Sequence, residues 1–486
     1  MSMLRLVGLT SFMFASGLLL STYGMITLAL EAARLAPANA TIVLPSFLAL
    51  AGVSQLVCPL AGYLSDRHVS RWGKRRPFIA AGAGALALGL LVQWASRAGE
   101  FPGLRFDVYG NSPANQRARK AATAVYAVAF FISMIALNFA YTAATCLVPD
   151  KVPPSQTGMA NGVATLSQVA GSCVGFLFYF VYDDLNMLYA LYLTAVLFSA
   201  ALTLICAGGD DAQQRGSQDR GERDDAETLM EKQPQRRAGR RDPRLEAPQP
   251  KAGFSWVALC DCYYVSPREP ATRDFFFVLV SRTLYYTGGS AQAFLQYYVR
   301  DRLDVSSATS LDRWLTRLGF DPEDAARATC LLALSGYVSG ALAALPAGAL
   351  SDKLGRKPVV VFSCGCMGMA MLGLGFSSTA TSMLAYGLLG GLGNGAYQAV
   401  DLALAVDTLP DHAESARFMG IWGVGAFVGV CLGPLIGGPL LYTFGQIGNP
   451  TPPRNSQPGY VALFLFGAVM LYASAAVLIR YVTKSR

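Results

Sequence analysis

The chain has 486 residues, of which 53% are hydrophobic and only 14% are charged. A soluble protein normally carries about a quarter charged residues, so the composition excludes an ordinary soluble domain and predicts an all-α polytopic membrane protein. The formal net charge of +8 resides mainly in the predicted loops, where it indicates orientation in a membrane rather than binding of nucleic acid.

Twelve apolar segments are each long enough to cross the ~30 Å hydrocarbon core of a bilayer as a helix. The first is too long for the core of a signal peptide and lacks a cleavage-type ending, so we expect it to be a membrane helix. The predicted spans are residues 5–30, 41–64, 77–96, 121–146, 158–181, 186–206, 274–299, 326–350, 358–376, 380–408, 416–443 and 459–482.

The sixth and seventh spans are separated by a region of different character. Residues 207–271 mix charges of both signs with few aromatic residues, which predicts a largely disordered linker. Within it, the aromatic segment "FSWVALCDCYY" (254–264) is predicted to form a short interfacial helix. The linker divides the chain into two predicted six-helix bundles, residues 1–206 and 272–486.

The basic residues of the short loops predict the orientation of the chain in the membrane. The loop 65–77 has five basic residues against one acid, and the loop 351–357 also carries three basic residues. Because basic short loops stay on the cytoplasmic side, we expect both loops, the linker and both termini to be cytoplasmic.

These two loops are copies of one motif. "GYLSDRHVSRWGKRRPF" (62–78) and "GALSDKLGRKP" (348–358) both fall between the second and third helix of their half, at an offset near 286. A second correspondence supports the repeat, since Asp150 and Asp407 each stand three residues before a proline. Two parallel six-helix halves are typical of one transporter architecture.

The motif has a physical reason of its own. An aspartate at the end of one helix can accept hydrogen bonds from the start of the next or pair with an arginine, and glycine permits the tight reversal between them. Such a charged contact could act as a two-state cytoplasmic gate; the alternative is that the arginines only enforce topology. The predicted gate residues are Gly62, Asp66, Arg67, Gly73, Lys74, Arg75, Arg76 and Asp150, and Gly348, Asp352, Lys353, Gly355, Arg356, Lys357 and Asp407.

The pattern G-x-L-S-D-[RK] followed by G-[RK]-[RK]-P resembles the loop signature of the major facilitator superfamily. The first copy has four extra residues, and this expanded form is similar to the sucrose-transporter-like branch, which is related to the glycoside–cation symporters. "YQAVDLALAVDTLP" and "LVPDKVPPSQTG" are similar to bacterial members of that branch. The resemblance covers the spans but not the linker. It implies the major facilitator fold, in which helices one, four, seven and ten line a central cavity.

Two charged residues lie clearly within predicted spans, Arg282 in helix seven and Asp401 in helix ten. A buried charge is costly unless it is paired or hydrated, so each is a candidate functional residue. At 1.5 Å per residue, Arg282 lies about 12 Å and Asp401 about 9 Å from the same membrane surface. We therefore expect an ion pair in the cavity wall; the alternative is a structural pair that holds helix seven against helix ten.

Polar side chains extend both positions into stripes at helical spacing. Amides, hydroxyls and aromatic faces suit a neutral polyhydroxylated solute, although single Ser, Thr and Gln residues also join helices to one another. The candidate contacts are Tyr285, Gln292 and Gln296 on helix seven, Asn394, Tyr397 and Gln398 on helix ten, Asn138 and Tyr141 on helix four, and Asn161 and Gln168 on helix five. Helix one offers only Ser16, Tyr23 and Thr27.

The sequence departs from the resemblance in its charges. Sucrose symporters are expected to carry acids and an arginine on helices one and four, but helix one has no charge between Arg5 and Glu31, and helix four has none between Lys120 and Asp150. Proton coupling would then rest on Asp401 alone or be absent.

We therefore expect a secondary transporter that moves a small polar solute, most simply a sugar or glycoside, with or without a proton. Two histidines, no zinc-type cysteine spacing and no nucleotide-binding motif favour neither a metal nor another cofactor. Two alternatives stay open, an organic-anion carrier of the same fold and a transceptor that signals through the linker. A membrane enzyme is not expected, since no nucleophile–base pair lies within the spans.

Overall fold

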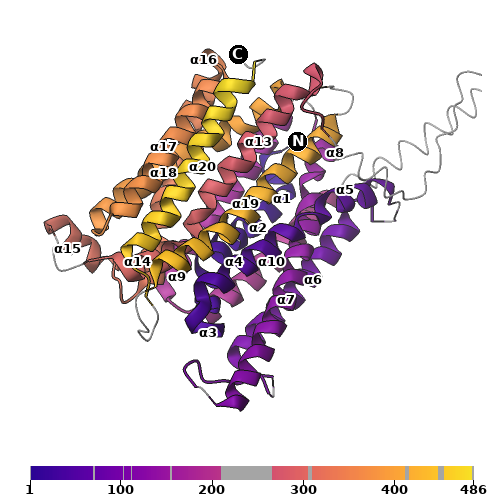
Figure 1. The fold of residues 1–486 in the computed structure, drawn as a ribbon. Coiled ribbons are helices and arrows are strands. Elements are labelled where there is room, and N and C mark those ends of the chain that lie inside the picture. The colour runs from indigo at the N-terminus through magenta and orange to yellow at the C-terminus, as the bar shows by residue number, and fades with distance from the viewer. Residues whose placement is uncertain are drawn as a thin grey trace, which may run out of the picture.

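Each of the twelve predicted spans is helical in the computed structural model of the protein (Figure 1). The structure describes residues 2–483 except 69, 71, 102, 111, 154, 155, 209–264, 305–308, 411–414 and 447–453. The predicted interfacial helix at 254–264 therefore lies outside the described residues, and the predicted domain boundaries within the linker stay predictions.

The N-terminal half follows the predicted order of spans. Its first crossing is built from four consecutive helical segments and its second from three. The elements are α1 (Met3–Leu9), α2 (Phe12–Thr22), η1 (Tyr23–Thr27) and α3 (Leu28–Leu35); η2 (Pro37–Asn39), α4 (Ala40–Ser54) and α5 (Val57–Arg67); and then α6 (Arg76–Ala98), α7 (Pro113–Thr145), α8 (Leu147–Lys151), α9 (Thr157–Tyr182) and α10 (Leu185–Gly208).

The C-terminal half repeats this arrangement, again with an interrupted first crossing. One short helix, α15, is added between its first two crossings. The elements are α13 (Pro270–Gly289), η4 (Ser290–Phe294), α14 (Leu295–Arg302), α15 (Ser310–Arg317), α16 (Ala325–Leu354), α17 (Arg356–Phe376), α18 (Ala380–Asp407), α19 (Ser415–Gly445) and α20 (Gln457–Tyr481).

Ten helices of the described part are long and apolar enough to cross a membrane by length and composition. Helices seven (α13 to α14) and ten (α18) are not among these ten. Helix seven is interrupted by η4 and carries charges, and α18 carries Asn394, Gln398 and Asp401. The two helices with the weakest membrane character are therefore the two that carry the predicted ion pair, as expected for helices whose polar face is covered by protein.

The first crossing of each half is not a regular α-helix. Residues 23–27 form a π-helical turn, η1, and residues 290–294 form a 3₁₀ segment, η4. Both interruptions lie near the middle of the crossing, where a change of winding rotates the side chains that follow it. Helical spacing therefore does not continue through either segment.

Glycines allow the closest helix contacts within each half. A Cβ atom on Gly395 of α18 would lie 2.0 Å from the carbonyl oxygen of Gly340 on α16, and one on Gly391 would lie 2.2 Å from that of Gly336. A similarly close contact in the N-terminal half is between α2 and α9, where a Cβ on Gly171 would lie 2.0 Å from the Phe14 carbonyl oxygen. Such backbone approach replaces the hydrophobic effect as the source of packing in a membrane.

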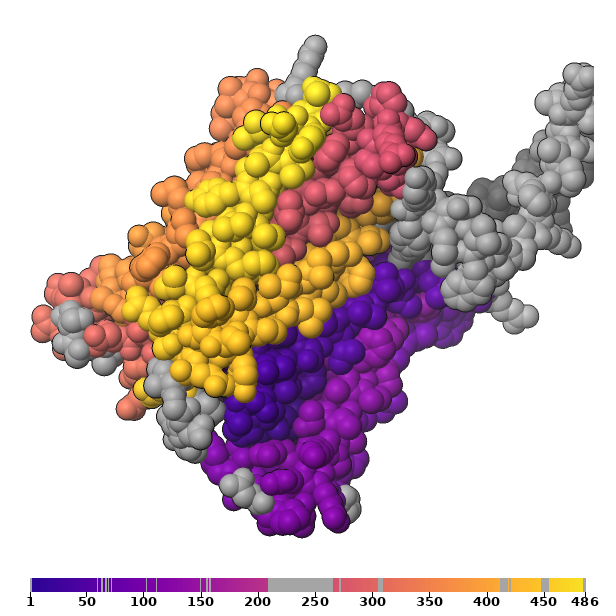
Figure 2. Space-filling model, in the orientation of Figure 1, coloured from indigo at the N-terminus to yellow at the C-terminus, as the bar shows by residue number. Residues whose placement is uncertain are grey.

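The two halves lie side by side and contact each other through α4 with α19 and α9 with α16 (Figure 2). We call the end of the bundle with the two repeated loops the loop end and the opposite end the far end. At the far end, Tyr297 Oη donates to the carbonyl oxygen of Ala29 at 2.9 Å, and Arg327 Nε donates to that of Phe180 at 2.8 Å. In Figure 1 the loop ends of α5 and α16 lie apart from each other.

Candidate functional site

A cavity of about 270 Å³ lies between the two halves near the middle of the bundle. It is enclosed by the interrupted first crossing of each half together with α4, α16, α17, α18 and α19. The lining residues are Leu20, Ser21, Gly24, Met25 and Leu48 from the N-terminal half and Tyr285, Tyr286, Gly289, Ser290, Gln292, Ala293, Tyr337, Met367, Asn394, Gln398, Val430 and Pro434 from the C-terminal half.

Most polar groups of the cavity belong to helices seven and ten. Tyr285 Oη donates to Asn394 Oδ1 at 3.2 Å, and Gln398 Nε2 donates to Tyr286 Oη at 3.2 Å. The Tyr285 ring stacks on the buried Tyr397 ring, with centroids 3.4 Å apart and planes 5° apart. The two helices thus present hydroxyl and amide groups in fixed positions beside an aromatic wall, which is a chemistry suited to a polar solute.

One polar contact in the cavity joins the two halves. Tyr337 Oη of α16 lies 2.7 Å from Ser21 Oγ of α2, and Ser21 Oγ also lies 2.7 Å from Ser172 Oγ of α9. The Phe176 ring packs against the Tyr337 ring with centroids 5.7 Å apart. Any movement that separates α16 from α2 must therefore break a hydrogen bond in the cavity wall.

Arg282 and Asp401 form an ion pair, and both side chains are nearly fully buried. The Arg282 guanidinium also lies over the Trp422 ring, 3.4 Å from its centroid, and near the Tyr286 ring at 4.9 Å. The pair is not among the residues that line the cavity. It lies behind the wall on the loop-end side, because Tyr286 separates Arg282 from the cavity and Trp422 covers the guanidinium.

The structure places four of the ten predicted contact residues on the cavity wall, namely Tyr285, Gln292, Asn394 and Gln398. The other six are elsewhere. Tyr397 lies behind Tyr285, Gln296 is buried, Asn138 Nδ2 donates to Ser54 Oγ at 2.8 Å, Asn161 is exposed, and neither Tyr141 nor Gln168 is a lining residue.

The winding of the helices explains why some predicted contact residues do not line the cavity. The predicted stripe on helix seven assumed 3.6 residues per turn throughout, whereas η4 rewinds residues 290–294. Consequently Ser290 and Ala293 line the cavity and Gln296 turns away from it. On helix one, Ser21 and Gly24 line the cavity, while the expected Ser16, Tyr23 and Thr27 are buried in the N-terminal half. Tyr286 and Tyr337 were missed, since no polar stripe includes them.

The first repeated loop forms an internal contact that we call the N-clasp. Arg75 Nε donates to Asp150 Oδ2 at 2.8 Å, and Arg75 Nη1 donates to Ser65 Oγ. Gly73 has a φ of 89°, a left-handed conformation that favours glycine. The contact joins the end of α5 and the start of α6 to α8. The side chains of Asp66 and Arg67 lie outside the described part of the structure, and Lys74 is exposed.

The second loop forms the same contact, the C-clasp. Arg356 Nη1 donates to Ser351 Oγ at 2.7 Å and also to Asp352, and Arg356 Nε lies 3.5 Å from Asp407 Oδ2. Gly355 has a φ of 94°. The contacts described above join, for each clasp, elements of the same half.

Other predicted gate residues lie outside the two clasps. Lys357 Nζ donates to the carbonyl oxygens of Ile479 at 3.2 Å and Val482 at 2.9 Å, which closes the last turn of α20. Arg76 packs against Gly208 at the end of α10. Lys353 is exposed, and a Cβ atom on Gly348 would meet no neighbour. The basic residue directly before the proline of each motif therefore lies at the end of the last helix of its half.

Part of the chain matches a known protein family, and its whole fold matches that of solved structures. Residues 314–486 match the family model described as the Major Facilitator Superfamily. A crystal structure of a D-xylose–proton symporter has the same fold with a TM-score of 0.59, and the match covers 99% of this chain and 97% of that chain at 12% sequence identity. The residues that match the family model lie in the C-terminal half of the chain. The shared fold and the ten long apolar helices of the described part are those of a multi-pass membrane protein.

Curated relatives match shorter segments. A methylenomycin A resistance protein from Streptomyces coelicolor is 29% identical over 147 residues, which are 29% of this chain and 28% of the relative. A sucrose transport protein from Oryza sativa subsp. indica is 32% identical over 127 residues, 25% of this chain and 24% of the relative. The matched segments thus span about a quarter of these relatives.

Glu31 and Asp301, which lie just outside the predicted spans, also have buried carboxylates at the far end. Glu31 Oε1 accepts from Arg97 Nη1 at 2.6 Å and Glu31 Oε2 accepts from Arg34 Nε at 2.8 Å. Asp301 Oδ2 accepts from Tyr460 Oη at 2.8 Å. Both carboxylates lie at predicted span ends, where sequence alone does not distinguish a buried acid from one in water. Both are satisfied by partners of their own half.

The two clasps make a testable prediction. Arg356→Gln removes the donor that joins Ser351 and Asp407, so hydrogen exchange of backbone amides around residues 352–358 is expected to rise. Arg75→Gln should do the same around residues 73–78. The exposed Lys353→Gln is the matched control and should leave exchange unchanged. Exchange that rises in both loops after either single substitution would contradict two separate clasps.

No group of three or more His, Cys, Asp or Glu side chains that could hold a metal ion occurs among the described residues.

Proposed function

We propose that the protein is a secondary transporter that moves a small neutral polar solute, a sugar or glycoside, by alternating access. The observation that carries the proposal is the cavity between the halves, in which Tyr286, Asn394 and Gln398 present hydrogen-bonding groups beside stacked aromatic rings. Its volume of about 270 Å³ is that of a small site, and its place between two six-helix halves is where such transporters bind their solute.

The charges of the site support a neutral solute. The Arg282 charge is compensated by Asp401 and covered by the Trp422 and Tyr286 rings, so little positive field reaches the cavity. The fold shared with a D-xylose–proton symporter and the partial match to a sucrose transport protein agree with a sugar. With both basic loops on the cytoplasmic side, the contacts at the far end correspond to a cavity that is closed toward the outside.

We further propose that Asp401 carries the coupling proton. Protonation of Asp401 would release Arg282, which is held between helices seven, ten and eleven by Asp401, Tyr286 and Trp422. Because Tyr286 belongs both to this cluster and to the cavity wall, proton binding and solute binding would act on the same side chain.

The proposal is tested by uptake of radiolabelled sucrose, maltose, xylose and glucose into proteoliposomes, with and without an inward proton gradient. Gradient-driven accumulation of one sugar is the expected result. Gln398→Ala, which removes a lining amide, should raise the KM for that sugar, whereas the matched control Asn161→Ala, at an exposed position outside the cavity, should not. Asp401→Asn should abolish accumulation while exchange of sugar across the membrane persists.

A second candidate function, an organic-anion carrier, is favoured by one observation. The buried Arg282 Nε atom has no hydrogen-bond partner among the described residues, so an oxygen of a solute could bind this donor once Tyr286 moves away from Arg282. Uptake of a carboxylate or a phosphate ester that Arg282→Lys reduces, with no uptake of any sugar, would replace the sugar proposal by this one.

A further inference from the structure

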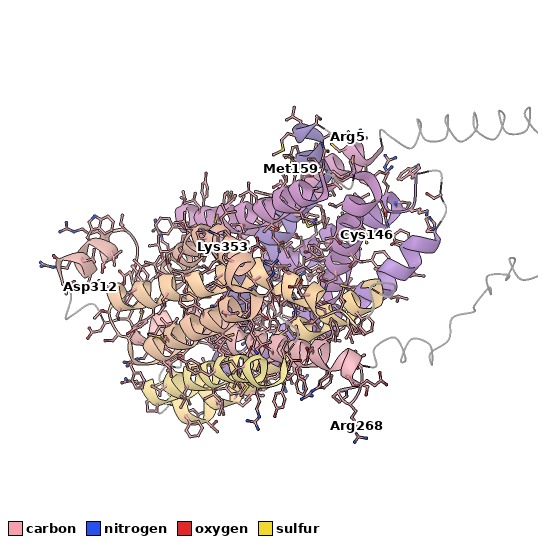
Figure 3. All side chains as sticks on the ribbon, turned by 90° about the horizontal axis from the view of Figure 1, so that it is seen from above. Arg5, Cys146, Met159, Arg268, Asp312 and Lys353 are labelled. Carbon is pink, nitrogen blue, oxygen red and sulfur yellow. The ribbon has the colours of Figure 1, made fainter. Side chains whose placement is uncertain are left out.

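The short helix α15 (Ser310–Arg317) has no counterpart in the N-terminal half and projects sideways from the far end of the bundle (Figure 1). In the view of Figure 3, the labelled Asp312 marks this helix at the side of the molecule opposite Cys146 and Arg268. A segment that only connects helices seven and eight would not need a capped amphipathic helix.

The helix is rigidly attached to the protein. Asp312 Oδ1 accepts from Thr381 N at 2.8 Å and from Thr381 Oγ1 at 2.6 Å, and Asp312 Oδ2 accepts from Thr309 N at 3.0 Å within a capping box. Burial alone would raise the pKa of the Asp312 carboxyl, but these hydrogen bonds outweigh it and lower the pKa to about 2. The carboxylate is therefore charged near neutral pH, and Leu315 is buried against the bundle.

An apolar stripe of α15 and its C-terminal extension faces outward. Leu311, Trp314 and Leu318 are 49%, 55% and 42% exposed, and their spacing of three and four places them on one side of the helix. Arg313 and Arg317 are exposed on a different side. A stripe of this kind, with tryptophan beside leucine and arginine on the polar side, is typical of helices that lie in a membrane interface.

The position of α15 relative to the spans agrees with a place in the membrane interface. Its contact with Thr381 sets it at the level where α18 begins, and α17 ends nearby in sequence with Phe376, which is 67% exposed. The apolar outer surface of the spans therefore ends close to the level of α15. The stripe, about 10 Å long at 1.5 Å per residue, is also far smaller than a stable protein–protein interface requires.

We propose that α15 is a membrane-interface anchor of the C-terminal half. Leu311, Trp314 and Leu318 insert into the boundary between headgroups and acyl chains, and Arg313 and Arg317 bind lipid phosphates of the same leaflet. A guanidinium suits this task, since it can donate two parallel hydrogen bonds to a phosphate. Because Asp312 fixes α15 to α18, the anchor holds the far end of helix ten at a constant depth while the halves move.

The experiment compares the full-length protein with Trp314→Phe and Trp72→Phe in vesicles of phosphatidylcholine and phosphatidylglycerol. Tryptophan fluorescence is quenched by lipids brominated just below the headgroup and, separately, by aqueous iodide. The difference between wild type and Trp314→Phe isolates Trp314, and Trp72, which is 60% exposed in the first repeated loop, is the matched control. We expect the brominated lipid to quench the Trp314 contribution and iodide to quench that of Trp72.

Quenching of Trp314 by iodide and not by brominated lipid would overturn the proposal, since the stripe would then face water. Protection of Trp314 from both quenchers only at high protein-to-lipid ratio would overturn it in favour of a second copy of the chain. The arginines are tested by the thermal shift that phosphatidylglycerol produces. Arg313→Glu with Arg317→Glu should lose this shift, and the exposed Arg117→Glu on the N-terminal half should keep it.

Discussion

Asp401→Asn is expected to destabilise the protein by about 3–5 kcal/mol, the usual cost of leaving one partner of a buried ion pair uncompensated. Arg282 would remain charged beneath Tyr286 and Trp422, with no carboxylate to balance it. Adding Arg282→Gln should restore much of this loss, because a neutral pair of amides leaves no unpaired charge. Thermal unfolding in a defined detergent, followed by size-exclusion chromatography, measures both effects.

The double variant also separates structure from coupling. If the pair only holds helix seven against helix ten, Arg282→Gln with Asp401→Asn should fold and accumulate sugar like the wild type. If Asp401 carries the proton, the double variant should fold but lose gradient-driven accumulation. Equal stability of wild type and Asp401→Asn would contradict the buried pair itself.

Gly395→Ala is expected to reduce the yield of folded protein strongly. The new Cβ atom would lie 2.0 Å from the carbonyl oxygen of Gly340, and a backbone atom in the middle of α16 can move away only if the two helices separate. Overpacking of this kind commonly costs about 1–3 kcal/mol or more, and here it also displaces the helix that carries Asn394 and Asp401. Fluorescence-detected size-exclusion chromatography of membranes solubilised at increasing temperature measures the loss.

The control for this substitution is Gly365→Ala on α17, where an added Cβ atom would meet no neighbour. Alanine favours a helix over glycine by up to ~1 kcal/mol, so this variant should be as stable as wild type or slightly more stable. Equal behaviour of Gly395→Ala and Gly365→Ala would show that α16 and α18 are not in backbone contact.

The fold and the pairing of charges could be predicted from sequence because each depends on a strong and local physical cost. Apolar length predicts the spans, and the cost of an unpaired charge in a membrane makes a partner necessary for Arg282, which depth along the helices identifies as Asp401. The repeated loops could be recognised for a similar reason. Gly73 and Gly355 occupy left-handed conformations that other residues avoid, so glycine occurs at the same place in both copies.

The cavity wall was less predictable, because it depends on how the helices are wound and tilted. The 3₁₀ segment η4 turns Gln296 away and brings Ser290 to the cavity, and nothing in the composition of "GGSAQAF" (288–294) distinguishes this winding from a regular helix. Tyr337 belongs to no predicted polar stripe, and only the packing of α16 against α2 and α9 gives it a role.

The uneven lining of the cavity bears on how such a protein could acquire a new solute. The N-terminal half supplies Leu20, Met25 and Leu48 with Ser21 as its polar side chain, whereas the amides and most hydroxyls come from the C-terminal half. The C-terminal half of the protein should thus determine which solute is preferred. A chimera that keeps residues 1–206 and takes its second half from a relative with another solute would then follow the donor of that second half.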